Sequence, residues 1–311
     1  MKTAFLFPGQ GTQAVGMGAD IAAAFPAAAE LFARANEVVG FDLRKVCFEG
    51  PADRLNSTTM SQPAIFATSA ALLEVLRASA TGQNIRPDVT AGLSLGEYTA
   101  LYAAGAISFA DGLRLVKRRG EAMQAAADAT EGTMVSILGL DDDKVRQLCR
   151  EASGGELLEP VNFNCPGQIV ISGTLGACER AERLAEKYGA IKAVRLEVAG
   201  AFHTTMMAPA AQALQQALVQ MQISQPPAVR TIANITADYY HGPESVIKGL
   251  TRQLTSPILW QKCMERLLAD GVEEFCEIGP GRVLTGLMKR INRKTKVTNI
   301  SDLNSLKAVI G

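Results

Sequence analysis

The chain contains few of the residues that mark metal sites and disulfide frameworks. It has two histidines and six cysteines among 311 residues, and no two cysteines form a C-x-x-C pair. Two histidines cannot supply a zinc site of the usual Cys/His spacing, so we expect no bound metal. Cysteines in this pattern are typical of small buried side chains in a reducing compartment.

Long apolar runs and an excess of charge of one sign are also missing. No stretch reaches the roughly 18 apolar residues of a membrane-spanning helix, and the run 4–7 is too short for a signal peptide. The 31 basic and 31 acidic residues cancel. The sequence therefore offers no overall field for nucleic acid or an anionic membrane, and we expect a cytoplasmic protein that binds neither.

Hydrophobic residues make up 48% of the chain, enough for a sizeable core. Apolar runs that end at glycine or proline alternate with long alanine- and leucine-rich segments, which is the pattern of an α/β protein. The patterns predict buried strands at 3–7 and 88–92, and helices at 19–39, 61–80, 95–104 and 109–127.

The segment from about 130 to 198 has a different rhythm, in which Asp141 is a candidate N-cap. Its order of elements, β-α-β-β-α-β, is the ferredoxin-like pattern. We expect a subdomain over residues 129–198, inserted into a larger domain of residues 1–128 and 199–311. The predicted elements of the insertion are strand 133–140, helix 142–152, strands 161–164 and 168–172, helix 175–188 and strand 190–198.

The clearest chemical signal is Gly92-Leu93-Ser94-Leu95-Gly96, which fits G-x-S-x-G. It lies between a predicted strand and a predicted helix, where this motif forms a sharp turn that exposes a nucleophilic serine. The helix beyond Ser94 directs backbone N–H groups to the place where an oxyanion would form. A turn of small residues that merely joins strand to helix would fit the same letters. We interpret Ser94 as a candidate nucleophile.

A serine needs a base to attack near neutral pH, and histidine is the usual choice. His241 lies in a polar segment that is typical of a surface turn. His203 follows the small and apolar residues 200–202, between a predicted strand and a predicted helix. A buried structural histidine is the ordinary interpretation of such a position. Because the serine needs a partner, His203 is the better candidate base.

Arg119 shares one face of the predicted helix 109–127 with Val116 and Met123. A guanidinium on an apolar face needs a partner, because burying an unpaired charge is costly. An internal carboxylate and the carboxylate of a bound substrate, held by two hydrogen bonds, both satisfy this need.

The loop 8–16 after the first strand matches nucleotide-binding patterns only loosely. Gly11-x-x-x-x-Gly16 is followed by Met17 and not by the lysine of a phosphate-binding loop. A loop whose N–H groups help to bind an oxyanion fits equally well, so we predict no nucleotide site.

Together these motifs resemble the malonyl-CoA:acyl carrier protein transacylase family in its stand-alone bacterial form, along nearly the whole chain. The resemblance implies an α/β-hydrolase-like large domain with the ferredoxin-like insertion, and a substrate cleft between them. The matching segments are Phe7-Pro8-Gly9-Gln10-Gly11, Gln62-Pro63-Ala64, the serine motif with Glu97, Arg119-Gly120, Asn162-Phe163-Asn164, Gly200-Ala201-Phe202-His203, Gln253-Leu254-Thr255-Ser256-Pro257 with Trp260, and Glu277-Ile278-Gly279-Pro280-Gly281.

The resemblance also implies roles for single residues. Ser94 and His203 would form a dyad without a carboxylate, in which the backbone carbonyl of Gln253 orients the imidazole. Arg119 would bind the free carboxylate of a malonyl group. The remaining implied roles are the backbone N–H groups of the oxyanion hole at Gln10 and Leu95, acyl selectivity for unbranched malonyl at Phe202, and pocket-lining polar side chains at Gln62 and Asn162.

The implied reaction transfers malonyl from malonyl-CoA to the phosphopantetheine thiol of acyl carrier protein, through a malonyl-serine in a ping-pong mechanism. We expect a monomer that serves fatty acid synthesis without a bound cofactor. A trans-acting acyltransferase of a polyketide pathway has the same motifs. A serine thioesterase or esterase is disfavoured by Arg119 and Phe202 and by the lack of an obvious triad acid. A carrier-protein-binding module without catalysis is disfavoured by the intact Ser94 and His203.

Two local features stay open. Many family members carry histidine immediately before the nucleophile, whereas this chain has Leu93, so we expect altered rates or pH response with the dyad intact. The basic run Lys289, Arg290, Arg293 and Lys294 fits either an acidic carrier protein or a solvated helix end.

Overall fold

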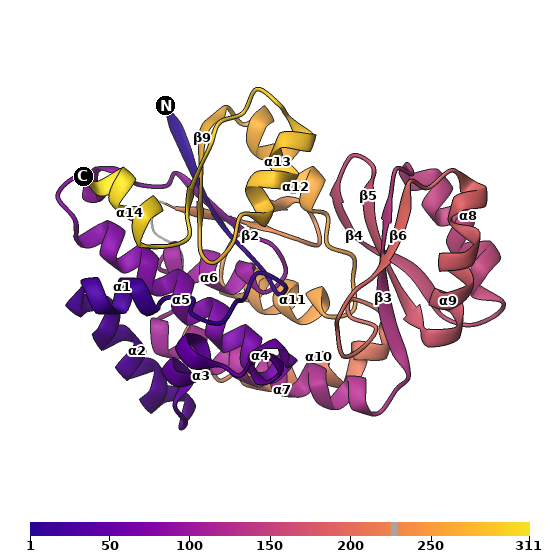
Figure 1. The fold of residues 1–311 in the computed structure, drawn as a ribbon, viewed down its shortest axis with the longest axis horizontal. Coiled ribbons are helices and arrows are strands. Elements are labelled where there is room, and N and C mark those ends of the chain that lie inside the picture. Colours follow the sequence, from indigo (N-terminus) through magenta and orange to yellow (C-terminus); the bar gives the residue numbers. More distant parts are fainter. Residues whose placement is uncertain (225–228) are drawn as a thin grey trace.

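Two β-sheets organise the chain in the computed structural model, which describes residues 1–224 and 229–311 (Figure 1). In the larger sheet of the described residues, all neighbouring strands are parallel except β7 and β8. Parallel strands are buried on both faces, which explains the apolar runs in the sequence. In sheet order the strands are β10 (Val297–Ile300), β9 (Val272–Ile278), β1 (Lys2–Phe7), β2 (Val89–Gly92), β7 (Arg230–Ala233) and β8 (Asp238–Tyr239).

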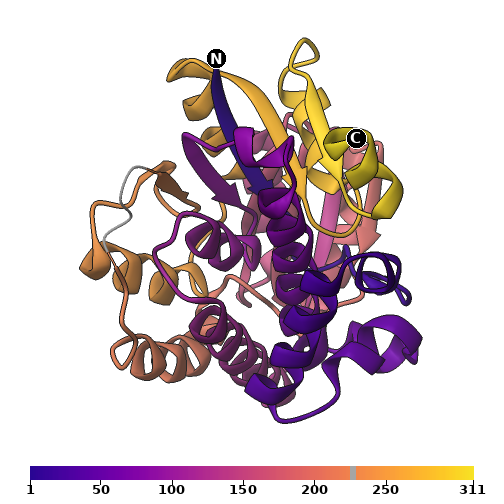
Figure 2. The same cartoon turned by 90° about the vertical axis from the view of Figure 1, so that its left-hand side faces the viewer.

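Helices cover both faces of this sheet, because successive side chains of a strand point to opposite faces. In β1, Phe5 and Phe7 pack in one apolar core, and Ala4 and Leu6 pack in another. The second core is closed by α12 (Trp260–Ala269) and α13 (Val283–Ile291). Most helices of the first core lie below the strands in Figure 1, while α14 lies beside them near the C-terminus, as Figure 2 also shows. The helices of this core are α1 (Ala19–Ala24), α2 (Pro26–Val39), α3 (Leu43–Glu49), α4 (Ala52–Asn56), α5 (Thr58–Ala78), α6 (Gly96–Ala103), α7 (Phe109–Asp128), α10 (Ala208–Leu218), α11 (Pro243–Gln253) and α14 (Leu303–Ile310).

The smaller sheet is antiparallel and has the strand order β4-β5-β3-β6. Its two helices lie on its outer side in Figure 1 and share a separate apolar core with it. This order is that of a ferredoxin-like fold, so the predicted fold class is confirmed, whereas the predicted domain limits remain a prediction. The elements are β3 (Gly132–Leu138), α8 (Asp142–Ser153), β4 (Leu158–Cys165), β5 (Gln168–Thr174), α9 (Leu175–Leu184) and β6 (Lys192–Arg195).

Several predicted elements differ from the structure in their bounds. The predicted helix 175–188 ends as α9 at Leu184, and the predicted strand 161–164 is part of the longer β4. The predicted helix 19–39 is broken at Phe25, which is extended (φ −129°, ψ 116°), because the residue before a proline avoids the helical region and Pro26 starts α2. The predicted strand 190–198 is shorter, since β6 ends at Arg195 and the next residues line a cavity. The N-cap at Asp141 is confirmed: its carboxylate accepts a hydrogen bond from the backbone N–H of Lys144 at 2.9 Å.

Glu277, the first residue of the glycine-rich motif 277–281, has a structural role at the start of α13. This fully buried residue of β9 accepts hydrogen bonds from the backbone N–H groups of Leu284 and Thr285, both at 2.9 Å, at the start of α13. The hydroxyl of Thr285 (2.5 Å) and the side-chain amide of Asn299 (3.2 Å) also donate to this carboxylate. The first N–H groups of a helix lack partners within the helix, so the carboxylate caps α13 and ties it to the sheet.

We expect Glu277→Ala to lower the free energy of unfolding by about 2–3 kcal/mol, because it leaves buried donors without an acceptor. Urea unfolding of the purified variant measures this change. Glu273→Ala is the matched control, because Glu273 lies on the same strand but is exposed. Equal unfolding midpoints for the two variants would contradict the capping role.

Among the described residues, no helix is both long and apolar enough to cross a membrane.

Candidate active site

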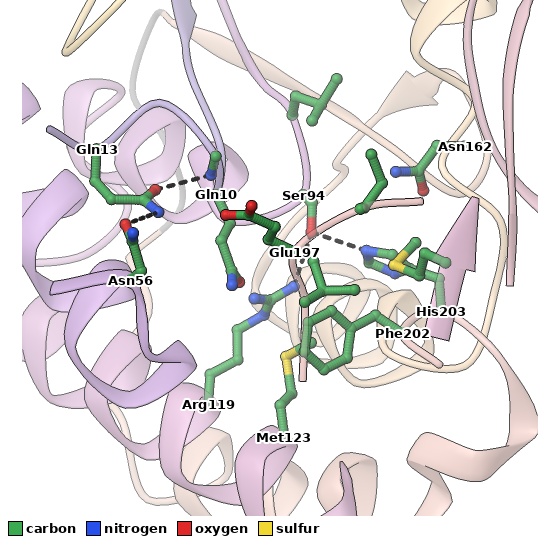
Figure 3. A pocket seen from close by; sticks show the side chains of 15 residues that line it. Gln10, Gln13, Asn56, Ser94, Arg119, Met123, Asn162, Glu197, Phe202 and His203 are labelled. Carbon is green, nitrogen blue, oxygen red and sulfur yellow. Dashed lines mark hydrogen bonds between the residues drawn. The ribbon is translucent and has the colours of Figure 1, made fainter. Parts of the chain in front are cut away.

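A cavity of about 460 Å³ opens where the two sheets meet (Figure 3). Segments far apart in the sequence form its walls: the loop after β1, the turn after β2, helix α7, strands of the smaller sheet and the segment after β6. Of the residues predicted for a site, those on its wall are Gln10, Ser94, Arg119, Asn162, Phe202 and His203.

Ser94 stands at a sharp turn between the end of β2 and the start of α6. Its backbone is left-handed (φ 50°), which is uncommon for a residue other than glycine. The flanking glycines are required by close contacts. A Cβ on Gly92 would lie 1.9 Å from the carbonyl carbon of Gly96, and one on Gly96 would lie 2.0 Å from the carbonyl oxygen of Phe7. The strand–turn–helix arrangement predicted around Ser94 is therefore present.

Two buried amide side chains hold this turn. The backbone N–H of Ser94 donates to Oδ1 of Asn234 at 2.7 Å, and Nδ2 of Asn234 donates to the carbonyl of Gly92 at 2.7 Å. From the other side, Nε2 of Gln253 donates to the carbonyl of Ser94 at 2.9 Å. No motif in the sequence indicates Asn234 as a site residue. It directly follows β7, the parallel neighbour of β2, and the carboxyl ends of parallel strands are where sites form in such sheets.

His203 lies within hydrogen-bond distance of Ser94, with 3.0 Å between Nε2 and Oγ. Its Nδ1 is 2.7 Å from the backbone carbonyl of Gln253. Because a carbonyl only accepts hydrogen bonds, Nδ1 carries the proton, and Nε2 is free to accept one from the serine hydroxyl. Burial, and then the positive charge of Arg119, lower the pKa of His203 to about 4. The imidazole is thus neutral near pH 7, as a general base must be.

Arg119 is fully buried on α7 and reaches the same serine. Its Nη2 donates to Oγ of Ser94 at 2.9 Å and to Oε1 of Gln253 at 3.0 Å, while Nη1 donates to Oε1 of Gln62 at 2.9 Å. Burial lowers the pKa of the guanidinium, and Tyr98 and Glu97 oppose this shift. In the part of the chain that the structure describes, no carboxylate forms a direct ion pair with Arg119. The guanidinium is therefore available to form an ion pair with an anion that enters the cavity.

The other predicted site residues occupy different positions around the cavity. Neither Gln10 nor Leu95 uses its backbone N–H as a donor within residues 1–224 and 229–311. Oδ1 of Asn162 likewise has no partner there. Gln62 was expected to line the pocket, but it lies behind Arg119, fully buried, where it holds the guanidinium.

The loop after β1 is fixed by its own side chains. Gln13 accepts a hydrogen bond from the backbone N–H of Gly11 at 2.8 Å and donates to Asn56 at 3.0 Å, as Figure 3 shows. These contacts tie the loop that carries Gln10 to α4. The N–H groups of this loop are thus held in place at the cavity wall.

Comparison with known proteins shows similarity over the whole chain. Residues 4–307 match the family model described as the acyl transferase domain. The malonyl CoA-acyl carrier protein transacylase of Bacillus subtilis is 44% identical over 99% of this chain and 96% of its own length. An acyl carrier protein S-malonyltransferase from Vibrio cholerae has a similar solved structure, with 42% identity, a TM-score of 0.92 and coverage of 99% and 100% of the two chains.

A second similar structure is a complex of a type II PKS acyl-carrier protein with its malonyl-transacylase. It has 39% sequence identity and a TM-score of 0.94, and the match covers 100% of this chain and 99% of that one. Both structures resemble this chain along both sheets.

Proposed function

The chain belongs to the acyl transferase family, among the malonyl CoA-acyl carrier protein transacylases, and from this premise we propose which reaction its cavity performs. It transfers malonyl from malonyl-CoA to the phosphopantetheine thiol of acyl carrier protein, through a malonyl ester of Ser94. The observation that carries this proposal is the position of Ser94 Oγ, 3.0 Å from a neutral imidazole nitrogen and 2.9 Å from a buried guanidinium.

The first interaction of the substrate is between the negative charge of its malonyl carboxylate and Arg119. The malonyl carboxylate enters the cavity and accepts hydrogen bonds from Arg119, in place of the bond from Nη2 to Ser94 Oγ. The guanidinium is already held by Gln62 and Gln253, so little of its freedom is lost on binding. The same contact places the thioester carbon next to the serine.

Acylation then follows from the hydrogen bonds of the resting site. Ser94 Oγ attacks the thioester carbon, and its proton passes to His203 Nε2. The oxyanion accepts hydrogen bonds from the backbone N–H groups of Gln10 and Leu95. When the C–S bond breaks, the imidazolium gives its proton to the coenzyme A sulfur, which leaves as the thiol.

The second half of the reaction reverses the first with a different thiol. The phosphopantetheine thiol of the carrier protein gives its proton to His203 and attacks the malonyl ester. The C–O bond to Ser94 breaks, and the serine recovers its proton from the imidazolium. The sum is malonyl-CoA and carrier thiol giving malonyl-carrier and coenzyme A, with no cofactor in any step.

The acceptor pathway has two candidates. Transfer to the carrier protein of fatty acid synthesis is the primary proposal, and the similar complex with a type II polyketide carrier favours a second. Transfer rates from one enzyme preparation to both kinds of carrier distinguish them. Phe202 is buried at the cavity wall, and the family resemblance assigns it selectivity for unbranched malonyl, so we expect methylmalonyl-CoA to be a poor donor in either case.

The test of the proposed function is a comparison of malonyl transfer with malonyl hydrolysis. We expect the purified enzyme to convert malonyl-CoA to malonyl-carrier far faster than to free malonate. A serine thioesterase with the same nucleophile would give the opposite ratio. Dominant hydrolysis in the presence of the carrier would overturn the proposal.

Arg119→Ala should lower kcat/KM for malonyl-CoA by about tenfold to a hundredfold, because it removes hydrogen bonds between a buried charge and the malonyl carboxylate. Acetyl-CoA lacks that carboxylate, so its much slower reaction should change less. Arg118→Ala is the matched control, since the side chain of Arg118 is largely exposed on the same helix. Equal losses with malonyl-CoA and acetyl-CoA would contradict the role of Arg119.

A further inference from the structure

Glu97 is a buried carboxylate that the proposed reaction does not use. It lies in the first turn of α6 and is 1% exposed, outside the cavity wall. Three donors from other segments converge on it: the hydroxyl of Tyr240, Nε2 of Gln253 at 2.6 Å and the backbone N–H of Asn234 at 3.3 Å. A carboxylate with three donors far apart in the sequence fixes those segments relative to one another.

Two of these three donor residues also hold Ser94. Asn234 accepts the N–H of Ser94 at 2.7 Å, and Nε2 of Gln253 donates to the carbonyl of Ser94 at 2.9 Å. The carboxylate of Glu97 is therefore linked through Asn234 to the backbone N–H of Ser94, and through Gln253 to the backbone carbonyl of Ser94. The third donor, Tyr240, binds Glu97 without a contact to Ser94 among the described residues.

Glu97, together with Arg119 and the carbonyl of Ser94, sets which way the Gln253 amide faces. Because a carboxylate only accepts hydrogen bonds, the NH₂ group of Gln253 must point to Glu97, and its Oε1 then faces the Nη2 of Arg119. The reverse orientation would place donor against donor at Arg119. The backbone carbonyl of the same Gln253 holds the ring of His203.

We propose that Glu97 is a positioning residue for the acyl transfer, which as a carboxylate holds Asn234 and Gln253 so that Ser94, His203 and Arg119 keep their reactive arrangement. This inference rests on the proposed function, since it assigns those three residues to the reaction. The side chain of Glu97 touches neither substrate nor Ser94 and acts through its two amide-bearing partners. The backbone N–H of Glu97 donates to the carbonyl of Ser94 at 3.2 Å, a bond that Glu97→Gln retains.

The charge of Glu97 links this role to pH. Burial raises the pKa of Glu97 to about 7, against the hydrogen bonds from Tyr240, Gln253 and Asn234 and the charge of Arg119. Protonation of Glu97 below that pH replaces charge-assisted hydrogen bonds by weaker neutral ones. Burial and the charge of Arg119 lower the pKa of His203 to about 4, so we expect a fall in acylation rate through neutrality to come from Glu97 and not from His203.

The other titratable groups around Glu97 do not change charge in this range. Tyr240, Cys263 on α12 and Tyr98 on α6 face it within the described residues, and burial raises the pKa of each above its ordinary value. They are neutral near pH 7, whereas Arg119 on α7 stays charged. Glu97 is thus the group whose charge varies.

The test measures the rate of Ser94 acylation by malonyl-CoA at pH values on both sides of neutrality. The wild-type rate should fall as the pH drops through about 7. Glu97→Gln has nearly the same shape but cannot ionise, so its rate should be about tenfold to a hundredfold below the alkaline wild-type rate and should lack this fall. An unchanged rate with the same pH profile in Glu97→Gln would overturn the proposal.

Tyr240→Phe is the matched variant, since it removes a hydrogen bond that lowers the pKa of Glu97. The fall in rate should then move to higher pH, a shift that a merely structural role would not produce. If circular dichroism shows that Glu97→Gln does not fold, the pH profile of Tyr240→Phe is the test, and a profile that does not shift overturns the proposal. A wild-type enzyme that malonyl-CoA does not acylate would refute the proposed function itself, which is a distinct result.

Discussion

Replacement of Ser94 by alanine is expected to lower malonyl transfer to carrier protein by more than about 10⁴-fold, to the background rate. The hydroxyl is the group that forms the acyl bond, and alanine has no atom that can replace it. The loss should appear in kcat with both malonyl-CoA and acetyl-CoA. Steady-state transfer assays with the purified variant measure it.

The Ser94→Ala variant should remain folded, because the turn is held through backbone groups of residue 94 that alanine retains. A thermal unfolding curve close to that of the wild type is the control. Formation of a covalent malonyl adduct by the folded variant would show that another residue is the nucleophile.

His203→Asn is expected to lower the acylation rate by about 10²- to 10⁴-fold, the usual contribution of a general base. His203 has a left-handed backbone (φ 63°), and asparagine tolerates that conformation better than most residues. The substitution therefore removes the base without adding backbone strain. Single-turnover acylation by malonyl-CoA measures the effect.

His241→Asn is the matched control for this variant, since His241 is the second histidine of the chain and is exposed. Its acylation rate should stay close to that of the wild type. Retention of more than about a tenth of the wild-type rate in His203→Asn would be too small a loss for a general base.

The arrangement of elements could be predicted from the sequence because local signals mark it. Apolar runs that end at glycine or proline indicated β1 and β2, and the order of patterns over 129–198 indicated the ferredoxin-like sheet. The break at Phe25 was missed because the alanine-rich pattern continues on both sides of Pro26. The predicted limits of that sheet's last strand were wrong because Leu196 and Val198 are apolar but line the cavity.

The candidate site could be predicted at residues whose side-chain type itself indicates a chemical role. Ser94 lies in a glycine motif, His203 is one of two histidines that could act as the base, and helical spacing placed Arg119 on an apolar face. The carbonyl of Gln253 has no such signature, because every residue carries a carbonyl group. Its place beside the imidazole came only from the family resemblance, and the structure puts it 2.7 Å from Nδ1.

Buried polar contacts between distant segments could not be predicted at all. Asn234 lies 140 residues from the serine whose N–H it accepts, and Glu97 gains its partners from three separate segments only in the folded chain. Glu277 belongs to a motif that supported the resemblance, but its capping of α13 depends on where that helix packs. A buried polar group needs a hydrogen-bond partner, but the sequence around one group does not indicate which distant residue supplies that partner.

Mass spectrometry of the intact protein tests the central claim most directly. After incubation with malonyl-CoA, we predict the mass gain of a single malonyl group, located on the peptide that contains Ser94. Addition of acyl carrier protein with its phosphopantetheine thiol should remove that group from the enzyme and produce malonyl-carrier. No adduct, an adduct on another residue, or discharge to free malonate in place of malonyl-carrier would contradict malonyl transfer through Ser94.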